Sequence, residues 1–212
     1  MAPSTAPFHT LDPVSGQVVE TVLRSLERPE DREAWSTVLE AEPRSIERLG
    51  MEPSPSCRSD VGLDDATLLF LLALRRQEDG DRLTVAEGRH VERFGRFPEA
   101  QGCLLTYVLN WMRPTRGHEA DFERLANLLA RLAKGLDDDH PQATEGASGL
   151  RLHGWLASDD VSDLRVLLMG RCWTVAADEP LDGGMRDAVN HLTAMLRGAE
   201  RRGVGLLHRS HA

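Results

Sequence analysis

The sequence predicts an α+β fold that is predominantly helical, with seven or eight helices around two apolar central ones. The 212-residue chain has 41% hydrophobic and 28% charged residues, a balance typical of a globular protein with a buried core. Apolar residues recur at helical spacing in most of its long segments. Two short strand-like stretches, 171–176 and 204–209, predict a small two-stranded β element near the C-terminus.

In the first half of the chain, hydrophobic periodicity and helix-breaking residues define the expected elements. Residues 1–13 hold three prolines and no periodic pattern, which predicts a flexible N-terminal tail. Helices are expected from Ser15 to Pro29, over 31–42 and over 65–76. The stretch 65–76 is apolar on all sides, so it is expected to be central and buried. Thr84 and Glu87 form a capping-box pattern that predicts a further helix to about Phe94.

In the second half, the stretch 101–112 is the other apolar helix expected in the core. Residues 119–136 form an amphipathic helix, with leucines on one face and charged residues on the other. A helix begins at Ser158 or Asp159. The strand candidate 171–176, a helix over 185–202 and the strand candidate 204–209 predict a βαβ-like unit, a parallel pair with a right-handed crossover.

These elements suggest one compact unit made of two parts. The helical part spans 14–136, the polar stretch 137–149 is predicted to be a linker or loop, and the C-terminal α/β part spans 150–212. Because some 60 residues rarely bury enough surface to fold alone, we expect the C-terminal part to dock on the helical part.

Charge restricts the possible partners. The net charge of −9 disfavours nucleic acid and anionic membranes, which repel an acidic protein. Lys134 is the single lysine beside 24 arginines, a bias that we attribute to a GC-rich, bacterial genome. No glycine-rich loop surrounds Lys134, which excludes a P-loop. The expected partner is another protein, possibly a basic one.

The cysteines predict a reduced protein without a zinc ribbon. Cys57, Cys103 and Cys172 are odd in number and form no CxxC pair. We expect Cys103 and Cys172 to be small buried hydrophobes. The N-terminus lacks the basic and apolar regions of a signal peptide, and the longest apolar run, 66–74, is too short to span a bilayer. A cytoplasmic location is therefore expected.

An acidic turn is the first candidate for a chemical site. Asp178, Glu179 and Asp182, with Asp187 nearby, offer the oxygen ligands that a hard cation prefers. The interpretation that we favour is a solvated turn whose carboxylates lie near a helix N-terminus and suit its dipole. An anion cradle at Gly183 and Gly184 is disfavoured, because residues 178–187 carry four acids and one base.

Arg186 and His191 are the second candidate. Their Arg-x4-His spacing on a helix resembles the motif of HEPN-type ribonucleases, all-helical proteins in which Arg and His act on the scissile phosphodiester. This chain departs from that pattern, because the helix is expected between strands and in acidic surroundings. The structural alternative places Arg186 on a solvated face and His191 beside the apolar stripe, and we favour it.

The remaining histidines predict no metal site. His140 follows three aspartates in the expected linker, and His208 and His211 lie at the C-terminus, where backbone order is usually poor. No cofactor motif occurs either, since the chain contains no Gly-x-Gly-x-x-Gly.

The function expected from these observations is a non-catalytic cytosolic interaction or regulatory protein, such as an adaptor or an immunity-type inhibitor. Its acidic ends would steer it toward a basic partner. The alternative is a metal-dependent or Arg/His hydrolase or nuclease centred on residues 178–191.

Overall fold

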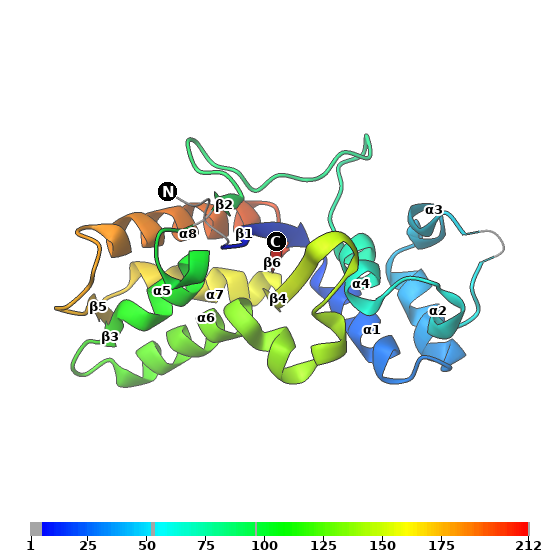
Figure 1. Ribbon diagram of the computed structural model, residues 1–212, viewed down its shortest axis with the longest axis horizontal. Coiled ribbons are helices and arrows are strands. Elements are labelled where there is room, and N and C mark those ends of the chain that lie inside the picture. Colours follow the sequence, from blue (N-terminus) through cyan, green and yellow to red (C-terminus); the bar gives the residue numbers. More distant parts are fainter. Residues whose placement is uncertain (1–5, 52–53, 96, 212) are drawn as a thin grey trace.

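A computed structural model describes residues 6–51, 54–95 and 97–211, which form an α+β fold with eight α-helices and two small antiparallel sheets (Figure 1). The predicted fold class is confirmed at this level. Within the described residues, no helix is long and apolar enough to cross a membrane.

The helices begin and end mostly where caps and periodicity place them. Asp31 and Asp64 accept hydrogen bonds from the first-turn N–H groups of α2 and α4, as N-caps do. The helices are α1 (Gly16–Glu27), α2 (Arg32–Ala41), α3 (Ser45–Leu49), α4 (Asp65–Ala73), α5 (Leu104–Trp111), α6 (Glu119–Asp139), α7 (Ser158–Met169) and α8 (Gly184–Arg201). The strands are β1 (Phe8–Val14), β2 (Arg93–Gly95), β3 (Met112–Pro114), β4 (Leu150–Leu156), β5 (Trp173–Val175) and β6 (Gly205–His211).

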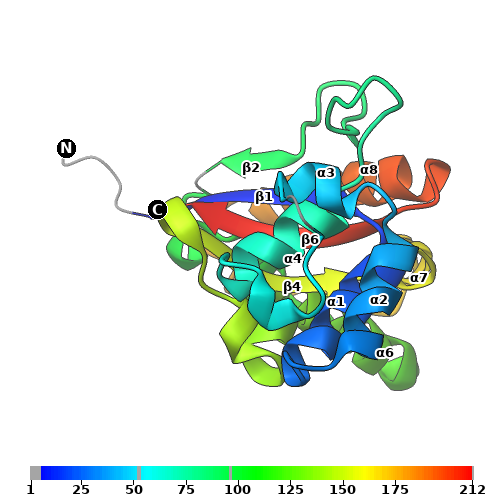
Figure 2. The same cartoon turned by 90° about the vertical axis from the view of Figure 1, so that its right-hand side faces the viewer.

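The larger sheet joins the two ends of the chain. Its strand order is β2-β1-β6-β4 with every pair antiparallel, so β1 and β6 occupy the centre (Figure 2). Their register runs from Phe8 opposite His211 to Val14 opposite Gly205. The smaller sheet pairs β3 with β5.

Two hydrophobic clusters lie on opposite sides of this sheet. Helices α5 to α8 cover one side, and α1, α2 and α4 supply the other (Figure 1). Neighbouring strand residues alternate between them, so Leu206 belongs to the first cluster and Leu207 to the second. The two apolar helices, α4 and α5, are both buried, but each contributes to a different cluster.

The N-terminal tail expected over 1–13 is a strand from Phe8 onward. Leu11, Asp12 and Val14 are 0% exposed, and β1 is paired along its whole length with β6. The prediction counted Pro13 among the signs of a flexible tail. A proline near the end of a strand removes only one backbone hydrogen-bond donor from the sheet, so the strand tolerates it. Residues 1–5 lie outside the described part.

The βαβ-like pair expected near the C-terminus is wrong. The strands predicted at 171–176 and 204–209 exist as β5 and β6, but they belong to different sheets. Because β1 and β4 occupy both edges of β6, β5 pairs instead with β3 across the end of α5.

The helix predicted from the Thr84 and Glu87 capping box is also absent. The carboxylate of Glu92 accepts hydrogen bonds from the Thr84 hydroxyl and from the N–H groups of Val85 and Ala86, which holds an irregular loop. Glu87 pairs instead with the backbone of His90.

The stretch 137–149 is not a detached linker. Its first three residues complete α6, and Ala143 is fully buried. The N–H of Ala147 donates to the side chains of Asp64 and Thr67, which fastens the segment to the start of α4.

A buried ion pair ties the long loop after α4 to the sheet. The carboxylate of Asp12 is 0% exposed and contacts Arg82 at 2.6 Å, with Arg209 on its other oxygen. The guanidinium of Arg209 also lies 5.1 Å from the ring centroid of Phe70. The pairing matters because an unpaired buried carboxylate is strongly destabilising.

Gly154 brings α6 into direct contact with β4. A Cβ atom at this position would lie 1.9 Å from the carbonyl oxygen of Arg131 and 2.7 Å from that of Leu132. The register between β4 and β6 shifts between Leu152 and Gly154, which makes His153 the extra residue of a β-bulge.

We predict that Gly154→Ala lowers the free energy of unfolding by about 3 kcal/mol, because the new methyl group forces α6 away from β4. The matched control is Gly135→Ala on α6, where a Cβ would make an ordinary 3.7 Å contact with Cβ of Arg131. That control should stabilise the protein by about 0.5–1 kcal/mol. Urea unfolding measures both, and equal effects would show that the close contact is not needed.

Candidate functional site

Three histidines and one cysteine meet on the α5–α6 side of the sheet. His9 lies on β1, His208 on β6 and His153 on β4, and Cys103 immediately precedes α5. In the β1–β6 register His9 is opposite Ser210 and His208 is opposite Leu11. His9 and His208 therefore lie on one face of the sheet, together with Leu11 and Ser210, because alternate strand residues point the same way.

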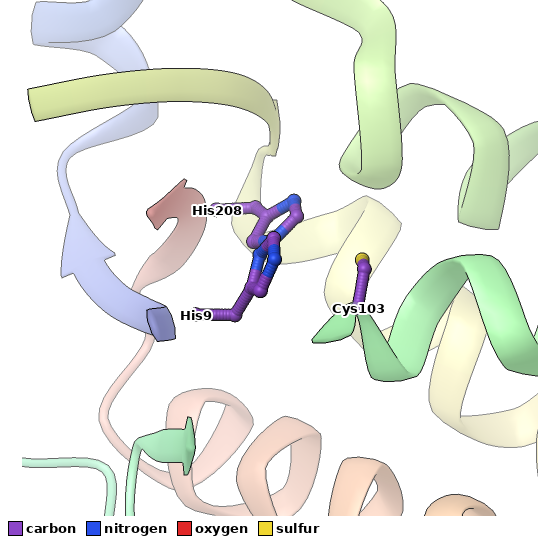
Figure 3. Close-up of side chains that lie close together, drawn as sticks. All are labelled: His9, Cys103 and His208. Atoms are coloured by element: carbon purple, nitrogen blue, oxygen red, sulfur yellow. The ribbon is translucent and has the colours of Figure 1, made fainter. Parts of the chain in front are cut away.

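His9 and His208 are in direct contact. Nδ1 of His9 lies 2.9 Å from Nε2 of His208, and the ring centroids are 5.1 Å apart. Figure 3 shows the two rings against each other, with Cys103 facing them from the start of α5. One donor atom each from His9, Cys103 and His208 lies within 4.8 Å of the other two. The three residues are buried, at 3%, 7% and 1% exposure.

The hydrogen bonding of this pair leaves a ring nitrogen unsatisfied. Two neutral imidazoles share one proton across the 2.9 Å contact. The carbonyl groups of Leu132 and Ala133 lie near the His208 ring, although Nδ1 of His208 forms no hydrogen bond of normal geometry among the described residues. In the tautomer with the His208 proton on Nδ1, His9 donates from its own Nδ1, and Nε2 of His9 carries a lone pair. Among the described residues, His9 Nε2 has no hydrogen-bond partner.

A strained turn positions Cys103. Ala100, Gln101 and Gly102 have φ values of 50°, 56° and 91°, so three consecutive residues are left-handed. Such conformations cost about 1 kcal/mol or more for each non-glycine residue, and they cluster at functional sites. Cys103 then occupies the N-cap position of α5 without a side-chain hydrogen bond to the helix. Its sulfur is thereby left to face the histidines.

The β-bulge directs His153 toward the same place. The extra residue in β4 puts His153 beside His208, and their rings stack with centroids 4.5 Å apart. Nε2 of His153 lies 2.8 Å from the hydroxyl oxygen of Ser210. His153 and Ser210 thus form a polar pair next to the two buried histidines.

Burial keeps the three imidazoles neutral. Desolvation lowers the pKa of His9 below 6.5, and desolvation together with nearby His9 lowers the pKa of His153 to about 4. The pKa of His208 is held well below 6.5, by burial first and then by the two other histidines. At pH 7 the rings are therefore in the form that can ligate a metal ion.

A pocket of roughly 660 Å³ opens beside these side chains. Its wall includes residues of β1, β4, β6, α5 and α6. The lining residues are Pro7, His9, Ala100, Gln101, Cys103, Thr106, Asn110, Ala133, Gly149, Arg151, His153, His208 and Ser210. None of these residues has a carboxylate side chain, and the formal charge of the pocket lining comes from Arg151.

The donor set suits a borderline-soft ion. Imidazole and thiolate ligands are typical of Zn²⁺ and its transition-metal neighbours, whereas Mg²⁺ and Ca²⁺ prefer oxygen. In a tetrahedral zinc site neighbouring N and S donors lie roughly 3.3–3.6 Å apart. The donor atoms of this group lie up to 4.8 Å apart, so an ion would require shifts of about 1 Å. An ion bound to Nε2 of His208 would also replace its hydrogen bond with Nδ1 of His9, because one lone pair cannot serve both.

The acidic turn after β5 does not gather its carboxylates. Oε1 of Glu179 accepts hydrogen bonds from the Tyr107 hydroxyl and from the N–H of Met185, which caps α8. Asp178 and Asp182 are exposed. Among the described residues, the metal-ligand cluster that forms does not include these three. Glu179 thus serves as a hydrogen-bond acceptor between Tyr107 and the start of α8, while Asp178 and Asp182 face solvent.

Arg186 and His191 do not form a common site. Five residues of helix separate them by about 140° around the axis of α8. Arg186 is exposed, and Nε2 of His191 lies 2.7 Å from the carbonyl oxygen of Val91 in the long loop.

Sequence reasoning missed the residues that do converge. His9 lay in the expected tail, and His208 in a C-terminus expected to be poorly ordered, yet both are buried in paired strands. Cys103 is buried as expected, but beside two imidazoles. Neither 8–14 (FHTLDPV) nor 205–211 (GLLHRSH) alternates between apolar and polar residues, so no local pattern pointed to the convergence of these side chains.

We predict that the protein loses stability as the pH falls from 6.5 toward 4. Each histidine binds protons more weakly in the folded state, so the unfolded state takes up more protons over this range. His153→Gln should remove roughly 2 kcal/mol of the loss. Urea unfolding at pH 7 and pH 4.5 checks this, and identical pH dependence in the variant and the wild type would contradict it.

Comparison of the chain with protein-family models, curated proteins and solved structures finds no match. Its functional interpretation therefore depends on the geometry of His9, Cys103 and His208.

Proposed function

We propose that this protein binds a divalent transition metal ion, Zn²⁺ or an ion of similar chemistry, through His9, Cys103 and His208. The observation that carries the proposal is the convergence of three donor atoms within 4.8 Å from β1, β6 and the start of α5. Buried polar groups are normally paired, and a buried acceptor without a partner costs about 1–3 kcal/mol. A metal ion at His9 Nε2 would offset that cost.

The surroundings support this assignment. The three imidazoles are neutral at pH 7 because burial lowers the pKa of each. The carbonyl groups of Leu132 and Ala133 lie beside the His208 ring, and backbone carbonyls often orient metal-bound histidines in this way. Cys103 binds a metal ion as the thiolate, and it lies at the N-cap of α5 with no side-chain hydrogen bond to the helix.

We predict that Co²⁺ binds the protein with the near-ultraviolet absorption of a thiolate–cobalt bond. Cys103→Ser should abolish that band and weaken binding by at least about 100-fold, since a ligand is lost. Cys57→Ser and Cys172→Ser are the matched controls, because both cysteines are buried but lie outside the cluster. Zn²⁺ at 100 times its Kd should also raise the free energy of unfolding by about 2.7 kcal/mol. Equal spectra for Cys103→Ser and the controls would disprove the assignment.

A second candidate function is the non-catalytic interaction with a macromolecular partner that the sequence favours. One observation supports it: Val166 and Met169, one turn apart on α7, are 59% and 58% exposed. Apolar side chains that neighbour each other on a helix surface are typical of protein-binding faces.

For this candidate we predict that a protein captured from the source cell by the wild-type chain is lost with the double variant Val166→Ser/Met169→Ser. The expected loss in affinity is 10-fold or more, because two apolar contacts are removed. The control is Asp159→Asn, a substitution at an exposed position of the same helix. A partner that binds all three proteins equally would show that this face is not used.

A further inference from the structure

We infer that the pocket beside the histidines binds a small organic carboxylate that completes the coordination of the metal ion. This inference rests on the proposed metal function and deepens it by naming the class of ligand. It follows from the number of protein donors, from the composition of the pocket wall and from the hydrogen-bond donors that face into it.

The protein supplies three donors to an ion that prefers four. Sites with three protein ligands keep one position open for water or substrate, whereas structural zinc sites are closed by four. His9, Cys103 and His208 all line the 660 Å³ pocket. The open position therefore faces the pocket, whose volume lies in the range that holds small organic molecules.

The wall of the pocket favours an anionic ligand. The chain has 34 acidic and 25 basic residues, yet the lining contains no carboxylate and one arginine, Arg151. Asp137 and Glu145 pair with Arg151 at 3.2 and 3.7 Å, so part of its charge is already compensated. The metal ion would supply the larger attraction, and Arg151 would select ligands whose carboxylate reaches it.

Neutral donors complete the site. Thr106 and Asn110 lie one turn apart on the face of α5 that lines the pocket. When His153 carries its proton on Nε2, it donates to Ser210, which frees the Ser210 hydroxyl to donate to a ligand oxygen. A carboxylate can use one oxygen for the ion and the other for such a donor.

The test uses the Co²⁺-loaded full chain and benzoate as the probe, with acetate as a smaller carboxylate. We expect both to change the visible spectrum of the bound Co²⁺ in a saturable way. Arg151→Gln should weaken benzoate binding by about 5–10-fold. Arg124→Gln, an exposed arginine paired with Asp163 outside the pocket, is the matched control and should bind like the wild type. Thr106→Phe should block benzoate by filling the pocket.

The outcomes separate the two proposals. The visible spectrum before benzoate is added reports that each variant is folded and holds the ion. An absent Co²⁺ spectrum in the wild type would overturn the proposed function and this inference together. A normal Co²⁺ spectrum that no carboxylate alters would overturn the inference while the metal site stands. Equal benzoate affinity for Arg151→Gln and Arg124→Gln would overturn the assignment of the ligand to this pocket.

Discussion

The arrangement of this protein depends on the contact between Gly154 of β4 and the carbonyl groups of α6. Since no side chain fits there, the helix lies directly on the strand, at 1.9 Å from where a Cβ would be. The same contact coincides with the β-bulge that moves His153 next to His208. It also brings the Leu132 and Ala133 carbonyls close to the His208 ring. One glycine thus links the packing of the α5–α8 side to the geometry of the candidate site.

Several features of the site work against stability rather than for it. Three polar rings occupy a place where apolar side chains would pack without a desolvation cost. Two non-glycine residues, Ala100 and Gln101, are held in left-handed conformations. One buried nitrogen of His9 has no partner among the described residues. Unfavourable features of this kind concentrate where a protein binds or transforms something, because selection for folding alone would remove them.

The sequence predicted the helices well where an apolar stripe was long and regular, as in 119–136 and 185–202, which match α6 and α8. It failed where structure depends on distant partners. The β5 and β6 strands were located but paired wrongly, since pairing is decided by which edges β1 and β4 already occupy. The candidate site was invisible for the same reason: His9 and His208 are 199 residues apart, and no local spacing relates them.

The pairing of β1 with β6 has a consequence for the order in which the molecule is made. During synthesis the segment 8–14 emerges first and the segment 205–211 nearly two hundred residues later. Until then β1 has no strand on the edge that β6 will occupy, and neither histidine has its neighbour. A newly made chain can assemble its helices as they appear, but it cannot hold an ion between His9 and His208 while still growing through α8. Metal capture in the cell would therefore wait for the synthesis of β6, and it would act on a chain whose preceding elements are already made.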